Sequence, residues 1–517
     1  MSTVRDSVIA FLRETGMTVM FGNPGSTELP LYREWPEDFR YILGLQESAV
    51  LSMADGYAQA TGNAAIVNLH SAAGLGHAMG SLVSAYKNQT PMVVTAGQQA
   101  RSLLLAEPFL GAIDATAMPK PYVKWSCEPA SAAETPRALA RAYAIAMTAP
   151  RGPVFVSLPV DDWDRPAEPV SPLKFMDDPV PSDDAIAGAA KRINASSNPV
   201  MVVGPEIDRH GGWDAAVALA EKLACPVWTS PMSSRCSFPE NHVQFAGFLQ
   251  SNEASVFEML AGHDLVLVIG APAFTYHFEN PAPRPLEADI LQVTSDACTA
   301  SYSKKGAVML GDVARAMEML TPRVEKRPEI GEPIRTPPEP APQSPLSTAA
   351  ILDLLQEMWP VNAILAEEAP SARPLMQRRL RIDAPESFFA TASGGLGFAG
   401  SAAVGLALGK PDRRVIALLG DGSALYTIQA LWTAAKENLP VTYIILNNGG
   451  YEALIGIARQ WQTPSVGTDL SGLDFVNLAN GFGIKAERAT TIREMEKALG
   501  HAFASQGPFL IDAVVED

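Results

Sequence analysis

The residues near the C-terminus that are best suited to chemistry follow two apolar, strand-like runs. RRVIALL is followed by GDGS (residues 420–423), and PVTYIIL is followed by NNGG (447–450). Because the carboxyl ends of parallel strands meet at one edge of an α/β sheet, Asp421 and Asn448 could lie side by side. Their carboxylate and amide oxygens, together with the backbone carbonyl of Gly450, suit Mg²⁺ or Ca²⁺. The pattern therefore predicts a metal site.

The helix expected between these two runs adds a feature that favours an anion. Gly422 and Ser423 would open this helix, and backbone amides at a helix N-terminus attract negative charge. Each half of the segment is by itself typical of a helix start or a turn. Their combination at this spacing favours a bound metal diphosphate, with Gly422 and Ser423 beside the phosphate groups.

Three segments that alternate strand-like and helical patterns must position such a site. Continuous β-branched runs such as AAIVNLH, DLVLVIG and RRVIALLG recur between helical stretches. Proline-rich stretches at 164–184 and 322–347 predict linkers. The predicted fold is α/β, with three doubly wound domains around parallel central sheets, at residues 1–163, 185–321 and 348–517. Whether the similar first and third domains share a fold is left open by the sequence.

The composition argues against several classes of protein. A formal net charge of −17 disfavours general binding to nucleic acid or to an anionic membrane. No apolar run reaches the roughly 18 residues needed to cross a bilayer, and the N-terminus lacks a signal-peptide pattern. Four cysteines without a close CxxC pair fit a reduced protein better than a disulfide or zinc framework. We expect a cytoplasmic enzyme.

GDGS and NN at this separation resemble the diphosphate-binding motif of the thiamine-diphosphate-dependent enzymes. Four further stretches resemble the 2-oxo acid decarboxylases of that family, and benzoylformate decarboxylases in particular. They are VMFGNPGSTELPLY (19–32), IVNLHSAAGLGHAMGSL (66–82), VKWSCEPASAAETP (123–136) and VLVIGAPAFTYHFENP (266–281). The resemblance implies decarboxylation of a benzoylformate-like 2-oxo acid to an aldehyde and CO₂, with a possible carboligase side activity.

The resemblance also implies a role for each domain and an assembly. Residues 1–163 would bind the pyrimidine end of thiamine diphosphate, and residues 348–517 would bind its diphosphate and the metal. Members of the family hold these two ends with different subunits. A homodimer or homotetramer with active sites at the subunit interface is therefore implied.

The catalytic residues implied by the resemblance lie mostly in the first domain. Glu47, at the start of an alanine-rich predicted helix, matches the glutamate that hydrogen-bonds the pyrimidine ring. Ser26 matches a residue that contacts the substrate carboxylate. His70 and His277, which both follow strand-like runs, match a pair that handles protons, as imidazoles titrating near neutrality can. His77 has no such match, and we interpret it as helix surface or interface.

Four more positions carry over to cofactor binding. Leu396 matches an apolar residue that holds the two cofactor rings in a bent arrangement. Gly394, two residues earlier, is also expected to bind the cofactor. Ser371 and Tyr451 match positions near the diphosphate. From the local pattern alone, Leu396 would be interpreted as ordinary core.

Departures from the resemblance concern the substrate pocket. Ala390 and Ile457 stand where benzoylformate decarboxylases have phenylalanine, which predicts a larger or reshaped pocket. Glu452 adds a carboxylate near the site, which is unfavourable for a substrate with an anionic tail. The physiological 2-oxo acid stays open. Three apolar side chains could still bind phenylglyoxylate: Phe109, Leu110 and Leu454.

Three alternatives compete with this interpretation. GLGFAG (395–400) precedes a predicted helix, and Asp421 ends the next strand, a pattern typical of NAD-dependent oxidoreductases. That alternative gives Glu47 and Asn448 no role. Acetolactate synthase-like carboligases share the glutamate and the GDGS and NN motifs, but generally lack the serine and the paired histidines. A catalytically silent subunit would have no need to keep the serine, the glutamate and both histidines.

Overall fold

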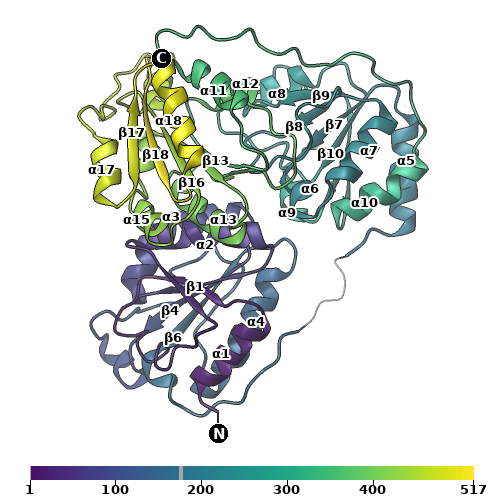
Figure 1. The fold of residues 1–517 in the computed structure, drawn as a ribbon. Helices are drawn as coiled ribbons and strands as arrows, with labels where there is room; N and C mark the ends of the chain where they lie inside the picture. Colours follow the sequence, from purple (N-terminus) through teal and green to yellow (C-terminus); the bar gives the residue numbers. More distant parts are fainter. Residues whose placement is uncertain (1, 174–178, 517) are drawn as a thin grey trace.

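The structure is a computed structural model that describes residues 2–173 and 179–516. Within these residues, three six-stranded parallel sheets follow one another along the chain, each flanked by helices (Figure 1). The predicted α/β class with three doubly wound domains is therefore confirmed. None of the helices described is long and apolar enough to cross a membrane.

The N-terminal domain has the strand order β2-β1-β3-β4-β6-β5. The carboxyl ends of its first three strands lie side by side, because β1 pairs in parallel with both β2 and β3. The strands are β1 (Val19–Gly22), β2 (Arg40–Leu43), β3 (Ala65–Leu69), β4 (Met92–Gln98), β5 (Ser126–Cys127) and β6 (Pro153–Pro159). The α-helices are α1 (Val4–Glu14), α2 (Glu47–Thr61), α3 (Ser71–Lys87) and α4 (Thr135–Met147).

The middle domain has a different strand order, β12-β11-β10-β7-β8-β9. Its strands are β7 (Pro199–Val203), β8 (Val227–Thr229), β9 (Phe245–Phe248), β10 (Leu265–Ile269), β11 (Asp289–Thr294) and β12 (Ala307–Leu310). Its α-helices are α5 (Asp183–Ala195), α6 (Pro205–Arg209), α7 (Trp213–Leu223), α8 (Glu253–Met259), α9 (Ala297–Ala300) and α10 (Val313–Leu320).

The C-terminal domain has the order β14-β13-β15-β16-β18-β17, which repeats that of the N-terminal domain. The question left open by the sequence is thus answered: these two domains share a strand order. The strands are β13 (Ile364–Glu368), β14 (Phe388–Ala390), β15 (Val415–Gly420), β16 (Val441–Asn447), β17 (Lys485–Ala489) and β18 (Phe509–Val514). The α-helices are α11 (Thr348–Glu357), α12 (Arg373–Arg379), α13 (Ala399–Gly409), α14 (Asp421–Leu425), α15 (Ala430–Lys436), α16 (Glu452–Gln460), α17 (Phe475–Gly481) and α18 (Ile492–Ala504).

The helix predicted between the two polar strand ends is interrupted. α14 ends at Leu425, and α15 begins at Ala430. The turn between them is tied to the start of α13, because the Thr427 hydroxyl donates to the Gly397 carbonyl at 3.2 Å. Periodicity alone could not reveal this distant partner.

Irregular chain connects the domains where prolines are dense. Residues 324–347 contain no helix or strand, and Figure 1 shows them crossing from the middle to the C-terminal domain. Part of the other predicted linker, residues 174–178, lies outside the described residues. Its described parts carry no helix or strand before α5 begins at Asp183, apart from an isolated bridge at Pro166.

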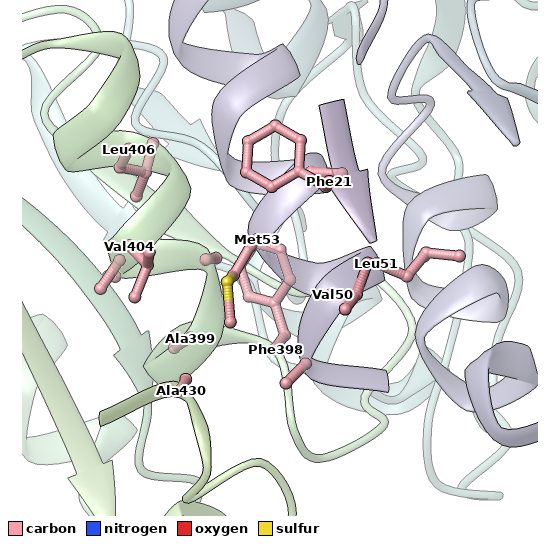
Figure 2. Packing of buried hydrophobic residues seen from close by; sticks show 14 of the residues in the cluster. Phe21, Val50, Leu51, Met53, Phe398, Ala399, Val404, Leu406 and Ala430 are labelled. Carbon is pink, nitrogen blue, oxygen red and sulfur yellow. The ribbon is translucent and has the colours of Figure 1, made fainter. Parts of the chain in front are cut away.

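Helices α2 and α13 join the N-terminal and C-terminal domains through one continuous core (Figure 2). The two helices approach so closely that backbone lies against backbone. A Cβ atom at Gly405 would lie 1.8 Å from the Met53 carbonyl oxygen, and one at Gly56 would lie 2.2 Å from that of Ala402. Packing therefore requires glycine at both positions.

We expect Gly405→Ala to destabilise the protein, because its new methyl group would force α13 away from α2. The cost should be about 1–3 kcal/mol, typical of overpacking, and would appear as a lower melting temperature in calorimetry. Gly500→Ala is the matched control: Gly500 lies on the exposed side of α18, and its Cβ would meet nothing within 4 Å. That variant should melt at or above the wild-type temperature. Equal melting of Gly405→Ala and wild type would contradict the close approach.

Candidate active site

One group of predicted site residues gathers at the carboxyl edge of the N-terminal sheet. Glu47 is the first residue of α2, just beyond β2, and His70 follows β3 directly. Ser26 lies on the surface in the turn after β1. Because β1, β2 and β3 are neighbours, the structure brings these residues to one edge. We call the turn 23–28 with Glu47 and His70 the N-terminal half-site.

A buried carboxylate that the sequence analysis missed orients His70. The Glu28 side chain is 1% exposed, and its Oε2 accepts from the Gly25 amide at 2.9 Å and lies 2.9 Å from His70 Nδ1. The Thr27 hydroxyl donates to Glu28 Oε1 at 2.5 Å. When the carboxylate accepts the Nδ1 proton, the other ring nitrogen of His70 is left free. The available signal was an acidic residue in a turn that follows a strand.

Glu47 has a histidine partner that was also not predicted. Its side chain is largely buried, and its Oε2 lies 3.0 Å from Nδ1 of His77 on α3. The His77 side chain is 62% exposed, which agrees with its interpretation as helix surface. The contact brings it into the N-terminal half-site nonetheless.

His277 follows β10, although not directly at its end. β10 ends at Ile269, and His277 lies in the irregular segment beyond, where its amide donates to the Ser251 carbonyl at 2.8 Å. It lines a cavity of about 290 Å³ together with Lys87 of α3 and Gly394 of the C-terminal domain. All three domains therefore contribute to this cavity.

The second group of predicted residues gathers at the carboxyl edge of the C-terminal sheet, where β15 and β16 are neighbours. Asp421 is buried, and its carboxylate accepts from the amides of Gly422 at 2.6 Å and Gly450 at 3.0 Å. The Gly450 amide also lies 3.2 Å from Asn448 Oδ1. The side-chain oxygens of Asp421 and Asn448 thus converge on one N–H group, at two neighbouring strand ends as predicted.

This oxygen set fits a divalent cation that is also bound by phosphate. In the part of the chain that the structure describes, no three His, Cys, Asp or Glu side chains form a group able to hold a metal. A cation beside Asp421 would therefore need amide, backbone and phosphate oxygens as its other ligands. Burial raises the pKa of Asp421, against the effect of the amides that donate to it. A bound cation would offset this cost of burying a carboxylate.

Three more predicted residues lie with Asp421, and a fourth, Ser371, lies in a different turn. The Tyr451 ring covers Gly422, since a Cβ there would lie 2.3 Å from Tyr451 Cε1. Ser423 is buried in α14 directly after Gly422. Ser371 lies on the surface in the turn before α12. No hydrogen bond between described residues joins it to the C-terminal half-site, a name we use for Asp421, Gly422, Ser423, Asn448, Gly450 and Tyr451.

Glu368 decides between the predicted site and the dinucleotide alternative. This buried carboxylate accepts from the amides of Gly397, Phe398 and Ala399 at 2.6–2.7 Å. In a dinucleotide-binding turn, such amides at the start of the helix would bind the pyrophosphate. Here the protein's own anion occupies them, so GLGFAG is not a phosphate-binding turn. The missed signal was ILAEEA, an apolar strand that ends in two acidic residues.

The same carboxylate fixes the loop that carries Gly394 and Leu396. Gly394 is exposed with a φ of +74°, a conformation that favours glycine, and Leu396 is half-buried. The other end of the loop is held by Ser393, whose Oγ lies 3.0 Å from Ser84 Oγ on α3. The loop is thus attached to both domains.

Three residues depart from the family pattern, Ala390, Ile457 and Glu452, and each has different surroundings in the structure. Ala390 is fully buried in β14 among core residues. Ile457 is half-buried on α16. The Glu452 carboxylate lies 3.1 Å from the Arg459 guanidinium on the same helix. This contact partly offsets the negative charge that Glu452 adds.

We expect Glu368→Gln to destabilise the loop and lower the melting temperature. Burial raises the pKa of Glu368 to about 7, with the three amides acting against this rise, so a test at pH 8 compares the charged carboxylate with a neutral amide. Glutamine has one acceptor oxygen instead of two and would turn a donor toward an N–H group. The loss should be about 1–3 kcal/mol. Glu496→Gln, exposed on α18, should melt within about 0.5 kcal/mol of wild type; similar melting of both variants would refute the role of Glu368.

Comparisons with known proteins agree with this geometry. The chain matches three family models of thiamine pyrophosphate enzymes. They are the N-terminal TPP binding domain at residues 2–118, the central domain at 186–320, and the C-terminal TPP binding domain at 371–513. Benzoylformate decarboxylase from Pseudomonas aeruginosa is 44% identical over 99% of this chain and 98% of its own length. Acetolactate synthase large subunits also match, at 25% to 29% identity, among them a probable one from Methanocaldococcus jannaschii at 26%.

Two solved structures superpose over the whole chain. Benzoylformate decarboxylase from Polynucleobacter necessarius has a TM-score of 0.97 at 39% identity, covering 100% of this chain and 99% of that one. The thiamine diphosphate-dependent 4-hydroxybenzoylformate decarboxylase from Rhodococcus jostii has a TM-score of 0.96 at 40% identity, with the same coverage. The chain therefore belongs to the thiamine pyrophosphate enzymes, and within them to the 2-oxo acid decarboxylase family that includes benzoylformate decarboxylase.

Proposed function

We propose that this protein uses thiamine diphosphate and Mg²⁺ to decarboxylate an aryl-substituted 2-oxo acid of the benzoylformate type, releasing CO₂ and an aldehyde. The observation that carries the proposal is the pair of half-sites at corresponding edges of two sheets with the same strand order. One edge presents Glu47 and His70, and the other presents Asp421 and Asn448. The relatives named for benzoylformate and 4-hydroxybenzoylformate support the substrate class.

The C-terminal half-site is proposed to hold the cofactor by its diphosphate. Asp421, Asn448 and the Gly450 carbonyl would bind Mg²⁺, or Ca²⁺ in its place. Gly422 and Ser423 would lie against the phosphate oxygens. Tyr451, Ser371, Gly394 and Leu396 are the remaining proposed contacts with the cofactor. When bound, thiamine diphosphate supplies the electron sink that a 2-oxo acid needs to lose CO₂.

The N-terminal half-site is proposed to provide proton transfer and substrate orientation. Glu47 would hold a proton at the pyrimidine ring, and Ser26 would bind the substrate carboxylate. His70 and His277 would move protons during release of the aldehyde. Glu28 is a positioning residue in this scheme, because it holds Nδ1 of His70 and leaves the other ring nitrogen to exchange protons.

We further propose that two copies of the chain complete each active site. No hydrogen bond between described residues joins Glu47 or His70 to the C-terminal half-site in the single chain. The segment after β4 exposes large apolar side chains, Leu105 at 99% and Phe109 at 97%. Exposed apolar groups of this kind are typical of an interface. A homodimer, or a homotetramer built from two, would cover them.

The substrate pocket of this assembly is proposed to accept an aromatic ring. Phe109, Leu110 and Leu454 expose apolar surface that could pack on it. Ile457, in place of a phenylalanine, would widen the pocket. Carboligation of an aldehyde is proposed as a side activity, whereas a primary acetolactate synthase activity is disfavoured by the lower identity of those relatives.

We expect the wild type, supplied with thiamine diphosphate and Mg²⁺, to release CO₂ faster from benzoylformate than from pyruvate. Glu47→Gln should lower kcat by about 10²–10⁴-fold, the usual contribution of a positioned acid or base, without changing the melting temperature. Both are measured with a panel of 2-oxo acids and a coupled aldehyde assay. Equal rates in both proteins would remove Glu47 from the mechanism. Acetolactate formed from pyruvate as the main product would favour the carboligase alternative.

Coexpression of two inactive variants tests whether the site lies between copies. Glu47→Gln and Asp421→Asn each damage a different half-site. If each site combines halves from two chains, random mixing leaves about one quarter of the sites intact. The mixed sample should therefore recover up to about a quarter of wild-type activity. If each chain forms its own site, the mixture should stay inactive.

A further inference from the structure

His77 is the side chain near the half-sites to which the proposed function gives no task. Its Nδ1 lies 3.0 Å from Oε2 of Glu47. Among the described residues, it is the only basic side chain within ion-pair distance of Glu47. The contact between His77 and Glu47 is therefore best understood through its effect on the position of the Glu47 carboxylate.

The position of His77 is fixed by its own backbone. The Ser48 hydroxyl, next to Glu47 on α2, donates to the His77 carbonyl at 2.5 Å. One turn further along α3, the Ser81 hydroxyl donates to the Ser48 carbonyl at 2.9 Å. The two helices are thus tied together at the level of Glu47, which holds the imidazole and the carboxylate in register.

The two oxygens of Glu47 have different surroundings. Oε2 faces the imidazole of His77. Oε1 lies over Gly74 of α3, where an added Cβ would come within 3.4 Å of it. No hydrogen bond of Oε1 is found among the described residues, so this oxygen keeps its capacity to accept or share a proton.

We propose that His77 is a positioning residue for Glu47, which holds Oε2 through its Nδ1–H so that Oε1 is presented to the pyrimidine ring of thiamine diphosphate. This inference rests on the proposed function, because Glu47 must be the residue that binds the ring. A fixed carboxylate loses less conformational freedom when the cofactor binds. His77 therefore strengthens cofactor binding without touching the substrate.

The first test measures the affinity of the cofactor-free protein for thiamine diphosphate by calorimetry, with Mg²⁺ present. His77→Leu should weaken binding about three- to tenfold, as expected for loss of one hydrogen bond. His77→Asn should restore most of the affinity, because its amide N–H can occupy the place of Nδ1–H. If His77→Leu binds like wild type, or His77→Asn binds as weakly as His77→Leu, the proposal is overturned.

A matched control removes an equivalent contact elsewhere. His501 on α18 lies 2.7 Å from Glu487 Oε1 and is also exposed. His501→Leu should leave the affinity for thiamine diphosphate unchanged. An equal loss in His501→Leu and His77→Leu would indicate a general effect on the fold and would overturn the proposal.

A double-mutant cycle separates this inference from the proposed function. In a Glu47→Ala background no carboxylate remains to be positioned, so His77→Leu should cause no further loss of affinity. The same fold-loss in both backgrounds would overturn the role of His77. If Glu47→Ala itself leaves affinity and turnover unchanged, the proposed function of Glu47 fails instead. Kinetically, His77→Leu should lower kcat at limiting cofactor while the KM for the 2-oxo acid stays unchanged.

Discussion

The contact between the backbones of α2 and α13 is the constraint on which the rest of the structure depends. Gly56 and Gly405 allow the two helices to touch without intervening side chains. The cores of the N-terminal and C-terminal domains are continuous through this contact (Figure 2). Since α2 begins at Glu47 and α13 begins just after Leu396, the same contact sets the position of Glu47 relative to the loop that carries Leu396.

Four carboxylates of the N-terminal and C-terminal domains differ in the hydrogen bonds that they accept, and this difference distinguishes their roles. Glu368 is satisfied by three backbone amides and shapes a loop. Glu28 is satisfied by an amide, a hydroxyl and His70, and it orients the ring. Glu47 has a single side-chain partner, His77. Asp421 accepts hydrogen bonds from backbone amides beside the side-chain oxygen of Asn448. The less completely a buried carboxylate is bonded within the protein, the more it gains from a cation or a proton donor.

The repeated strand order explains why both half-sites lie at sheet edges. In parallel sheets the side chains beyond the carboxyl ends of the strands are free of ladder hydrogen bonds and can face a ligand. The N-terminal and C-terminal domains both use this edge, whereas the middle domain has another order and contributes His277 through an irregular segment. His277 lines a cavity to which all three domains contribute.

The sequence by itself determined the fold class and the polar strand ends, and it predicted most residues of both half-sites but not Glu28. These depend on local patterns: continuous β-branched runs, GDGS and NNGG after strands, and a glutamate that opens a helix. The tertiary structure alone decided which distant groups meet. Glu28 with His70, His77 with Glu47, and Glu368 with the start of α13 are pairings across separate elements, and no residue spacing encodes them. The dinucleotide-like GLGFAG shows the physical reason. A local pattern fixes where the backbone amides point, but only the folded chain determines whether these amides donate to a ligand or to a buried carboxylate such as Glu368.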